Sequence, residues 1–464
     1  MHIELVVPPY KKVYGIVRSV NPTDPPLGLA YIAAYLKKNG VSCGIIDSEA
    51  EQMTLDDVVT KIKSINPSIV GITTTTHTIL DVYKLASNLK KINKNIVIVA
   101  GGPHATSLPS QTLKESEIDI VVRKEGEIPT LEIVRALENG VDLSAVEGVS
   151  YKSNGEIIEN ADASQIRDLD SLPFPSRELL PMKKYFPVGF PPSENTIYTS
   201  MLTTRGCAFR CTFCGVTTMF PKVRRRSPEN ILAEIDEVVQ KYNVNVIEFM
   251  DSILGLYPNI IKEMCQGIIE RKLNIKWMCC GRVDLMAPDL LQLMKEAGCV
   301  RIFYGIESGD QNILNHIQKR SSLDKIRETV KLTKEYEIPC VTSFILGLPG
   351  DTMETMKSTI DFAVELDADF ATCSLSTPYP GTVFYDAAGY EGDNFSDWSK
   401  YQTARYRYPV YSPDGISPEV IQKMLKKFYR KFYLRPTYLF KRIASINSID
   451  AFRYNFGFLK NLLS

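Results

Sequence analysis

Apolar residues in the first 140 positions form short unbroken runs that alternate with segments of helical periodicity. Strands that are apolar throughout are typical of a parallel sheet covered on both faces. The pattern therefore predicts a doubly wound α/β domain at 1–140, a fold that binds ligands beyond the carboxyl ends of its strands. The expected strands are 3–7, 43–46, 69–73, 96–100 and 118–122, and the expected helices are 27–38, 55–65, 79–92 and 129–138.

Residues 141–195 lose this alternation. Two short segments, 149–152 and 156–158, flank Ser153-Asn154-Gly155, which predicts a hairpin. A proline-rich stretch follows. We interpret 141–195 as a connector that runs over the surface between two domains.

Alternating strands and helices resume at 196–386. Six β/α units with right-handed crossovers predict a partial (β/α)6 barrel, with functional groups at the carboxyl ends of its strands. The remaining residues, 387–464, are predicted to be a helical C-terminal region. The expected barrel strands are 199–203, 246–250, 276–280, 300–304, 340–345 and 371–375, and the helices are 231–242, 258–271, 288–297, 323–336 and 353–366.

Composition narrows the possible partners and the location. Lys plus Arg and Asp plus Glu each number 54, so recognition of nucleic acid through bulk charge is not expected. No apolar run approaches the roughly 18–20 residues of a membrane span, and we expect a cytoplasmic protein. The aromatic and basic segment 418–464 allows two interpretations, a cap helix with a solvated basic face or peripheral membrane contact. The ten cysteines then indicate packing or metal binding rather than disulfides.

Three cysteines lie on one predicted loop directly after the first barrel strand. Cys207, Cys211 and Cys214 are separated by three and two residues, and Gly206 before them permits a tight turn. Thiolates at this spacing suit an iron–sulfur cubane, whereas structural zinc sites usually gather four ligands in two pairs. No fourth ligand is evident in the loop, so one iron would keep an open position. A zinc knuckle or three packed thiols are the alternatives.

The segment 203–214 resembles the three-cysteine motif of the radical S-adenosylmethionine (SAM) superfamily, with an aromatic residue before the last cysteine. The resemblance covers about 198–386. It implies a [4Fe-4S] cluster whose open iron binds SAM, with Phe213 near the adenine. It also implies an external one-electron donor of the flavodoxin or ferredoxin type, and a 5′-deoxyadenosyl radical that removes hydrogen from the substrate.

Four more positions, each after a predicted strand, match the family's SAM contacts. By the resemblance, Asp251 accepts the methionine amino group, although the second Asp of the family's Phe-x-Asp-Asp is Ser252 here. Arg282 can pair with a carboxylate, and Glu307 with the ribose hydroxyls. Leu346 begins a glycine-containing turn beside the adenosyl group. An ordinary turn or surface ion pair is the alternative for each position.

The N-terminal domain resembles the cobalamin-binding domain of many radical SAM enzymes, through Pro-Leu-Gly-Leu at 26–29, Gly-Gly-Pro-His at 101–104 and Glu-Gly-Glu at 125–127. A corrin beyond the strand ends needs small residues near the ring and donors for its amide arms. The expected cobalamin-binding residues are Pro8, Thr73, Thr74, His77, Gly101, Gly102, His104, Glu125 and Gly126.

The sequence also limits how cobalamin would bind. No Asp-x-His-x-x-Gly motif surrounds either His77 or His104, so we expect a cobalt without a histidine ligand. Each histidine has the alternative of an ordinary backbone hydrogen bond. No Gly-x-Gly-x-x-Gly follows the first strand, which disfavours nicotinamide or flavin binding. A domain that has lost its ligand remains the alternative for the whole unit.

The two resemblances together imply a cobalamin-dependent radical SAM methyltransferase, acting on an unactivated carbon through a 5′-deoxyadenosyl radical and methylcobalamin. The first alternative is an oxidative cyclase or rearrangement enzyme without net methyl transfer, like the anaerobic magnesium-protoporphyrin ester cyclases. Methylthiolation of tRNA is disfavoured because Cys43 is the only cysteine in the first 200 residues. A non-enzymatic cobalamin carrier is the remaining alternative.

The sequence assigns no catalytic acid or base, and the substrate is expected to be a small molecule or a peptide. Tyr304 and Tyr379 lie at the predicted mouth of the barrel, where they are candidates for the substrate pocket. Ordinary packing is the alternative for both tyrosines.

Overall fold

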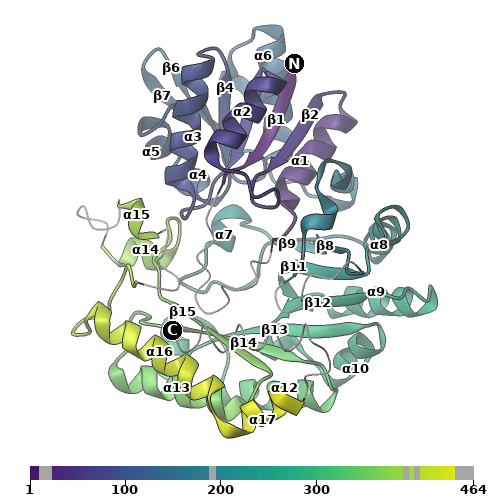
Figure 1. Cartoon of the computed structure of the whole chain (residues 1–464), viewed down its shortest axis with the longest axis vertical. Helices are drawn as coiled ribbons and strands as arrows, with labels where there is room; N and C mark the ends of the chain where they lie inside the picture. The colour runs from purple at the N-terminus through teal and green to yellow at the C-terminus, as the bar shows by residue number, and fades with distance from the viewer. Residues whose placement is uncertain (10–22, 188–194, 390–396, 402–407, 445–464) are drawn as a thin grey trace.

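A computed structural model of the protein describes residues 1–9, 23–187, 195–389, 397–401 and 408–444. Figure 1 shows two α/β units, the first from the N-terminal part of the chain and the second from the middle, with C-terminal helices against the second. The predicted fold class is therefore confirmed. None of the helices in these described ranges is both long and apolar enough to cross a membrane.

The N-terminal unit is a seven-stranded sheet in the order β2-β1-β3-β4-β5-β6-β7, with β1 to β5 parallel. Every strand and helix predicted in residues 1–140 is present, with some ends shifted by one or two residues, and α4 and α5 are additional. The elements are β1 (His2–Val7), α1 (Leu27–Lys38), β2 (Ser42–Asp47), α2 (Leu55–Ile65), β3 (Ile69–Thr73), α3 (Ile79–Ile92), β4 (Val97–Gly101), α4 (Pro103–Ser107), α5 (Pro109–Lys114), β5 (Ile120–Val122) and α6 (Glu127–Asn139).

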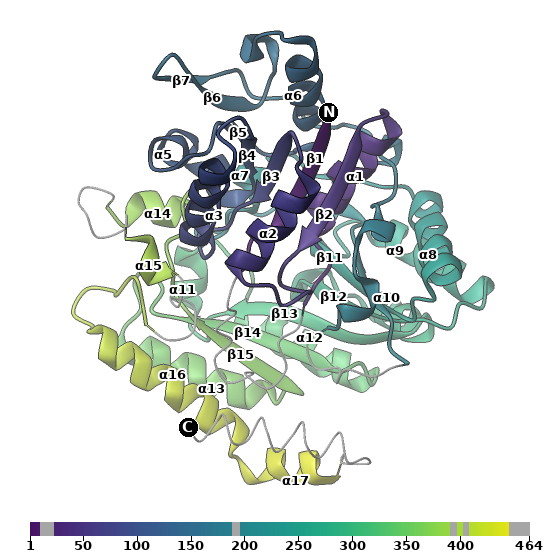
Figure 2. The same ribbon diagram turned by 45° about the horizontal axis from the view of Figure 1, so that its top comes forward.

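Helices cover both faces of this sheet, as unbroken apolar strands require (Figure 2). Val58 of α2 and Leu85 of α3 belong to the buried cluster on one face. Leu36 of α1 and Ile133 of α6 belong to the cluster on the other. The residues beyond the carboxyl ends of the strands are thereby left at an edge that faces the second unit (Figure 1).

The predicted hairpin is confirmed as β6 (Val149–Ser153) and β7 (Glu156–Glu159). Asn154 and Gly155 at its turn have φ values of 50° and 83°, as such turns require. The hairpin does not lie apart from the sheet, because β6 pairs antiparallel with β5. The sheet is therefore mixed rather than wholly parallel, which the sequence pattern alone did not predict.

The second unit is a six-stranded parallel sheet in the order β15-β14-β13-β12-β11-β8, which forms the predicted partial barrel. All predicted barrel strands and helices are present. They are β8 (Tyr198–Met201), α8 (Pro228–Tyr242), β11 (Val246–Leu254), α9 (Pro258–Glu270), β12 (Lys276–Gly281), α10 (Pro288–Glu296), β13 (Cys299–Glu307), α12 (Leu323–Glu335), β14 (Cys340–Leu346), α13 (Met353–Leu366) and β15 (Phe370–Leu375).

Short elements occupy the loops at the carboxyl ends of these strands. Helix α7 lies between the two units in Figure 1, and α14 and α15 lie beside the N-terminal unit. These elements are β9 (Thr204–Arg205), α7 (Val216–Met219), β10 (Arg224–Arg225), α11 (Gln311–His316), α14 (Val383–Ala387) and α15 (Trp398–Tyr401).

The C-terminal helices α16 (Pro418–Tyr433) and α17 (Pro436–Ala444) confirm the predicted helical character of the described part of that region. Tyr433 Oη lies 3.1 Å from the amide nitrogen and 2.7 Å from the carbonyl oxygen of Ala371 in β15. Tyr429 Oη contacts Cys373 in the same way, at 3.1 and 2.9 Å. Helix α16 therefore covers the edge strand of the barrel and satisfies part of its backbone.

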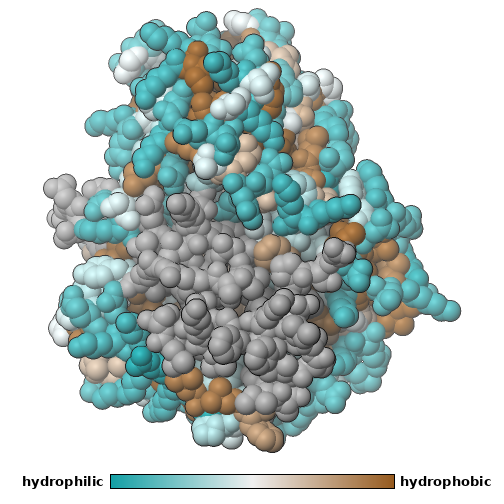
Figure 3. All heavy atoms as spheres, viewed as in Figure 1, coloured by the Kyte–Doolittle hydropathy of each residue, from teal (hydrophilic) through white to brown (hydrophobic). Residues whose placement is uncertain are grey.

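The surface in the view of Figure 3 is mainly hydrophilic where it is described, and hydrophobic side chains occur in small separate groups. Phe440 of α17 is 75% exposed, whereas Tyr438 two residues earlier is buried. Residues 445–464, which contain much of the segment considered for membrane contact, lie outside the described residues. Peripheral membrane contact therefore stays a prediction.

Candidate functional site

The cysteine loop leaves the barrel at the carboxyl end of β8 and returns to it through a short antiparallel pairing. Arg205 in β9 pairs with Arg224 in β10, and the amide of Arg226 donates to Thr203 O at 2.9 Å. We call these two segments, 203–205 and 224–226, the neck of the loop. The neck gathers both ends of the cysteine loop at one point of the barrel.

Gly206 follows the neck with a φ of 97°, a left-handed value that favours glycine. A Cβ at this position would lie 2.8 Å from Lys222 O, so the two sides of the loop approach too closely for a side chain. Cys207, Cys211 and Cys214 come next on this single loop. All three thiols are free and partly accessible, as prospective metal ligands must be.

Asp251 lies within β11 but does not point to an open position, because it is only 2% exposed. Its carboxylate accepts hydrogen bonds from the backbone and side chains of Thr203 and Thr204, at 3.0 Å from Thr203 N and 2.9 Å from Thr203 Oγ1. Asp251 therefore holds the neck from the barrel side, whereas the sequence predicted a direct contact to SAM.

Glu125 and Glu127 hold the same neck from the N-terminal unit. Arg205 donates from Nη1 to Glu125 Oε1 and from Nη2 to Glu127 Oε1, each at 2.6 Å. Arg224 donates to Glu125 Oε2, also at 2.6 Å. Glu125 was predicted to bind cobalamin, but its two oxygens are engaged by the neck of the cysteine loop. No local pattern predicts this contact, since the paired residues are 78 to 99 positions apart in the chain.

Arg282 is also directed to protein groups rather than to an open carboxylate site. It is 3% exposed, it pairs with Asp284 at 2.7 Å, and it donates to the carbonyls of Lys319 and Arg320. Its guanidinium lies 3.6 Å from the ring centroid of Phe209, a residue of the cysteine loop. Arg282 therefore joins the cysteine loop to the 319–321 segment, and Phe209 is a site residue that the sequence did not predict.

Glu307 ends β13 with a φ of 73°, a strained conformation for a residue with a side chain. Its Oε1 accepts from Lys319 Nζ at 2.8 Å, and both side chains are about 90% buried. Cys211 Sγ lies 3.9 Å from Gln318 O, so the same segment contacts the cysteine loop. Burial raises the pKa of the Cys211 thiol, while Lys319 acts to lower it. Lys319 is a second residue that no motif indicated.

Cys207 and Cys214 lie close enough to Cys211 for the three thiols to interact electrostatically. Burial raises the pKa of Cys214, and Cys211 and Cys207 raise it further. Phe213 packs against the barrel core. Leu346, in contrast, is 1% exposed within that core, so its side chain does not line a pocket.

The turn after Leu346 is held by a carboxylate that the sequence did not single out. Asp351 accepts from the amides of Gly347 and Leu348, both at 2.9 Å, and from Thr355 Oγ1 at 2.7 Å. Burial raises the pKa of Asp351 to about 6, although these hydrogen bonds act to lower it. Asp351 fixes the glycine-containing turn predicted to lie beside the adenosyl group.

The residues predicted for cobalamin lie together at the carboxyl edge of the N-terminal sheet. Thr73 in β3 and Gly101 in β4 are neighbours in register, and Pro8 follows β1. Gly102 lies so close to Thr74 that a Cβ on Gly102 would be 2.5 Å from Thr74 O. Gly126 lies against Ile32 of α1 in the same manner, with 2.7 Å between such a Cβ and Ile32 Cδ1.

The two histidines of this edge contact aromatic residues from the barrel side. His77 Nε2 lies 3.0 Å from Tyr379 Oη, in the loop after β15. His104 is 1% exposed, its Nδ1 lies 3.2 Å from Thr76 Oγ1, and its ring meets Trp398 edge to face at 4.8 Å. Burial lowers the pKa of His104 to about 4, so its imidazole is neutral. Tyr379 thus lies where the two units meet.

Tyr304, the other tyrosine predicted for the substrate pocket, is not at the mouth of the barrel. It is fully buried, and its Oη lies 2.8 Å from Thr333 Oγ1 of α12. The side chain therefore points outward between the sheet and its helices. Strand alternation explains the difference, since neighbouring positions of a strand face opposite sides.

The donor set of the loop fits an iron–sulfur cluster, because it supplies three accessible thiols and no competing disulfide. In the described ranges no three Cys, His, Asp or Glu side chains are already arranged around one metal position. The fit therefore rests on the chemistry of the thiols and the shared loop. At the N-terminal edge the buried His104 Nε2 has no partner within the described residues and is an available hydrogen-bonding atom for an amide-rich ligand, whereas Gly102 packs against Thr74 and the Thr74 hydroxyl already bonds Gly101 and Ala105.

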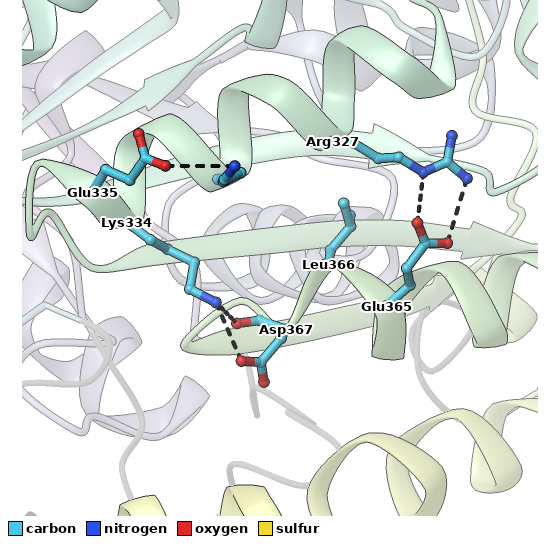
Figure 4. A pocket seen from close by; sticks show the side chains of 7 residues that line it. Arg327, Lys334, Glu335, Glu365, Leu366 and Asp367 are labelled. Carbon is cyan, nitrogen blue, oxygen red and sulfur yellow. Dashed lines mark hydrogen bonds and ion pairs between the residues drawn. The ribbon is translucent and has the colours of Figure 1, made fainter.

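A charged surface groove lies between α12 and α13 (Figure 4). Its side chains pair with one another, Arg327 with Glu365 and Lys334 with Asp367. Asp367 is the C-cap of α13 and lies three positions before β15 begins, which places the groove at the amino ends of the barrel strands. The cysteine loop follows a carboxyl end, so the groove lies at the opposite end of the barrel and adds nothing to the site.

Two family models match this chain. Residues 201–363 match the radical SAM superfamily, and residues 14–134 match the B12 binding domain. The first match contains the cysteine loop, Arg282 and Glu307. The second contains the carboxyl edge with its two histidines.

Similar proteins match most of this chain, across both of its units. An uncharacterized methyltransferase of Pyrococcus horikoshii is 38% identical over 96% of this chain and 95% of its own length. An anaerobic magnesium-protoporphyrin IX monomethyl ester cyclase of Rubrivivax gelatinosus is 29% identical over 89% of this chain and 75% of its own length. The solved radical SAM methyltransferase TsrM from Kitasatospora setae, with cobalamin and a [4Fe-4S] cluster, superimposes with a TM-score of 0.71 at 16% identity, covering 94% of this chain and 89% of that one. This last similarity shows the fold.

Proposed function

Because this chain belongs to the radical SAM superfamily and carries a B12 binding domain, we propose that it is a cobalamin-dependent radical SAM methyltransferase acting on an unactivated carbon. The methyltransferase relative that matches over nearly its whole length supports methyl transfer. The likeness to a solved enzyme that holds both cofactors supports the pairing of cluster and cobalamin.

One observation carries this proposal. The cysteine loop is held at its neck by the barrel through Asp251 and by the N-terminal unit through Glu125 and Glu127. The carboxyl edges of two sheets thereby meet around three accessible thiols. When bound, the cofactors supply one-electron cleavage of SAM and a transferable methyl group, chemistry that side chains cannot supply.

The chain's own residues bind and orient the cofactors. Cys207, Cys211 and Cys214 supply the thiolates, and the neck holds their loop between the two units. Glu307 stays a proposed partner of the ribose hydroxyls, held in place by Lys319. Asp251 and Arg282 act one step further away, through the neck and through Phe209.

The substrate and the electron source are proposed by class. Radical SAM enzymes need an external one-electron donor, and we propose one of the flavodoxin or ferredoxin type. We propose a small molecule or peptide as the substrate, with Tyr379 at the junction of the units as the remaining tyrosine candidate for its pocket.

A second function is supported by the cyclase relatives, one of which matches 89% of this chain. Such an enzyme would use the same cofactors for an oxidative ring closure without net methyl transfer. Both functions would use the same two cofactor regions of the described residues, so only the reaction products distinguish methyl transfer from ring closure.

The proposal is tested by anaerobic reconstitution with iron, sulfide and cobalamin, followed by reduction and addition of SAM. We expect an iron–sulfur absorption spectrum, 5′-deoxyadenosine, and S-adenosylhomocysteine together with a methylated product from candidate substrates. A cyclised or dehydrogenated product without S-adenosylhomocysteine would support the second function. Zinc in place of iron, or no deoxyadenosine after reduction, would refute both.

A further inference from the structure

The Glu-Gly-Glu segment at 125–127 contacts the cysteine loop rather than an open ligand site. Arg205 is enclosed by the N-terminal unit on three sides, by Glu125, by Glu127 and by the ring of Tyr31, whose centroid lies 5.1 Å from the guanidinium. The Arg205 side chain is 8% exposed, and the two carboxylate side chains are 7% and 4% exposed. Burial alone would lower the pKa of Arg205, but Glu127 and Glu125 raise it above its usual value.

The two carboxylates cannot move independently of the N-terminal unit. Lys124 before them has a φ of 64°, and its amide donates to Thr106 Oγ1 of α4 at 2.9 Å. Gly126 between them lies so close to Ile32 of α1 that a Cβ would be 2.7 Å from Ile32 Cδ1. The carboxylates are therefore fixed to α4, which begins directly after Gly102 at the edge predicted for cobalamin, and to α1.

The neck links the Glu125 and Glu127 carboxylates to the cysteines through only a few residues. Arg205 stands two residues before Cys207, and Gly206 between them is packed against Lys222 O. The second strand of the neck is held by the same carboxylate, since Glu125 Oε2 accepts from Arg224. A displacement of Glu125 or Glu127 must therefore displace both strands from which the cysteine loop emerges.

We propose that Glu125 and Glu127 are positioning residues that fasten the cysteine loop to the N-terminal unit, so that ligand binding at the edge of that unit stabilises the cluster. The fastening itself depends only on the contacts above. The effect on the cluster rests on the proposed function. Thermodynamic linkage requires the effect to be reciprocal, with the cluster favouring cobalamin as cobalamin favours the cluster.

The first test uses the full chain without cofactors. In the double variant E125Q/E127Q both charges are removed with little change of shape. Hydrogen exchange is then measured across peptides covering 203–226. We expect exchange there to rise roughly a hundredfold, because the guanidiniums of Arg205 and Arg224 lose the carboxylates that compensate their buried charges.

The matched control is D119N, the same kind of change at an ion pair with Lys90 that lies within the N-terminal unit and away from the loop. We expect no change at 203–226 in this variant. Unchanged protection at 203–226 in E125Q/E127Q would overturn the inference. So would an equal loss of protection throughout α1 to α6, because the two residues would then serve only the stability of their own unit.

The second test separates this inference from the proposed function. Iron release to a chelator is followed for reconstituted protein with and without hydroxocobalamin. We expect hydroxocobalamin to slow release at least about fivefold in the unmodified protein, and less than about twofold in E125Q/E127Q. Equal slowing in both would overturn the coupling. Failure of the unmodified protein to take up a cluster would instead refute the proposed function, while the exchange result would still decide the fastening.

Discussion

The barrel fixes two loops of the candidate site by different means. The cysteine loop after β8 depends on the other unit, since Glu125 and Glu127 bind the arginines of its neck. The turn after β14 depends on its own neighbourhood, since Asp351 binds the amides of Gly347 and Leu348. The position of the cysteine loop therefore depends on the N-terminal unit, whereas the position of the turn after β14 does not.

The two anchors also differ in charge. At the neck, carboxylates face guanidinium groups, and each charge is compensated by its partner. At the turn after β14, the carboxylate accepts hydrogen bonds from amides and the Thr355 hydroxyl and has Asp310 as a like charge nearby, so its own charge stays costly to bury. The neck should therefore be sensitive to the loss of either partner, and the turn should be sensitive to pH.

The largest expected effect comes from breaking the neck with R205M. The variant leaves Glu127 buried near a thioether instead of a cation and leaves Glu125 with Arg224 as its remaining cation, so we expect a loss of about 3–5 kcal/mol in the free energy of unfolding. Urea denaturation measures it. The control is R327M, whose arginine pairs with Glu365 on the surface and is 42% exposed. An exposed pair contributes less than about 1 kcal/mol, so equal losses in the two variants would contradict the distinction.

Local pattern explains why the fold could be predicted so fully. Helices such as α1 and strands such as β3 have the predicted bounds, because the periodicity of a segment reports which of its faces is buried. The pairing of β6 with β5 was not predicted. A hairpin can form from its own turn residues, but the strand that it joins is set by packing of the whole unit.

The second effect concerns the turn after β14. Burial raises the pKa of Asp351 from 3.8 to about 6, so between these values the folded protein binds a proton that the unfolded chain does not. The contribution of this group to stability is therefore fully present below about pH 4 and is lost as the pH rises through about 6. The variant D351N cannot ionise and avoids this loss. We expect D351N to gain roughly 2–3 kcal/mol relative to the unmodified protein between about pH 4 and pH 7.

Denaturation of both proteins at several pH values across this interval measures the difference. The carboxylates of the neck serve as the comparison within the same protein, since Glu125 and Glu127 pair with arginines, whose charge does not change over this pH range. A difference between D351N and the unmodified protein that stays constant with pH would contradict the view of Asp351 as a buried carboxylate without a compensating charge.

Motifs located the site, but they did not separate contact residues from the residues that position them. The loop of Cys207 was predicted because the spacing of its three cysteines along the chain is itself typical of a cluster-binding site. The motifs pointed to Asp251 in β11 and to Arg282 directly after β12, and the side chains of these two residues turn to Thr203 and to Phe209. Lys319 had no motif, since its value comes from meeting Glu307 across a strand end, a contact that only the folded chain creates.

The smallest expected effect comes from removing a single hydrogen bond between the two units, the one between Tyr379 and His77. Y379F keeps the ring and removes the hydroxyl that lies 3.0 Å from His77 Nε2, so we expect a loss of about 1 kcal/mol. A double-mutant cycle with H77A should show a coupling of about 0.5–1.5 kcal/mol. Y401F is the matched control, because its hydroxyl bonds Pro378 O at 3.0 Å within the C-terminal part of the chain. Coupling of H77A to Y401F as strong as to Y379F would show that the aromatic cluster responds as a whole, and that this junction, unlike the neck, has no specific polar contact.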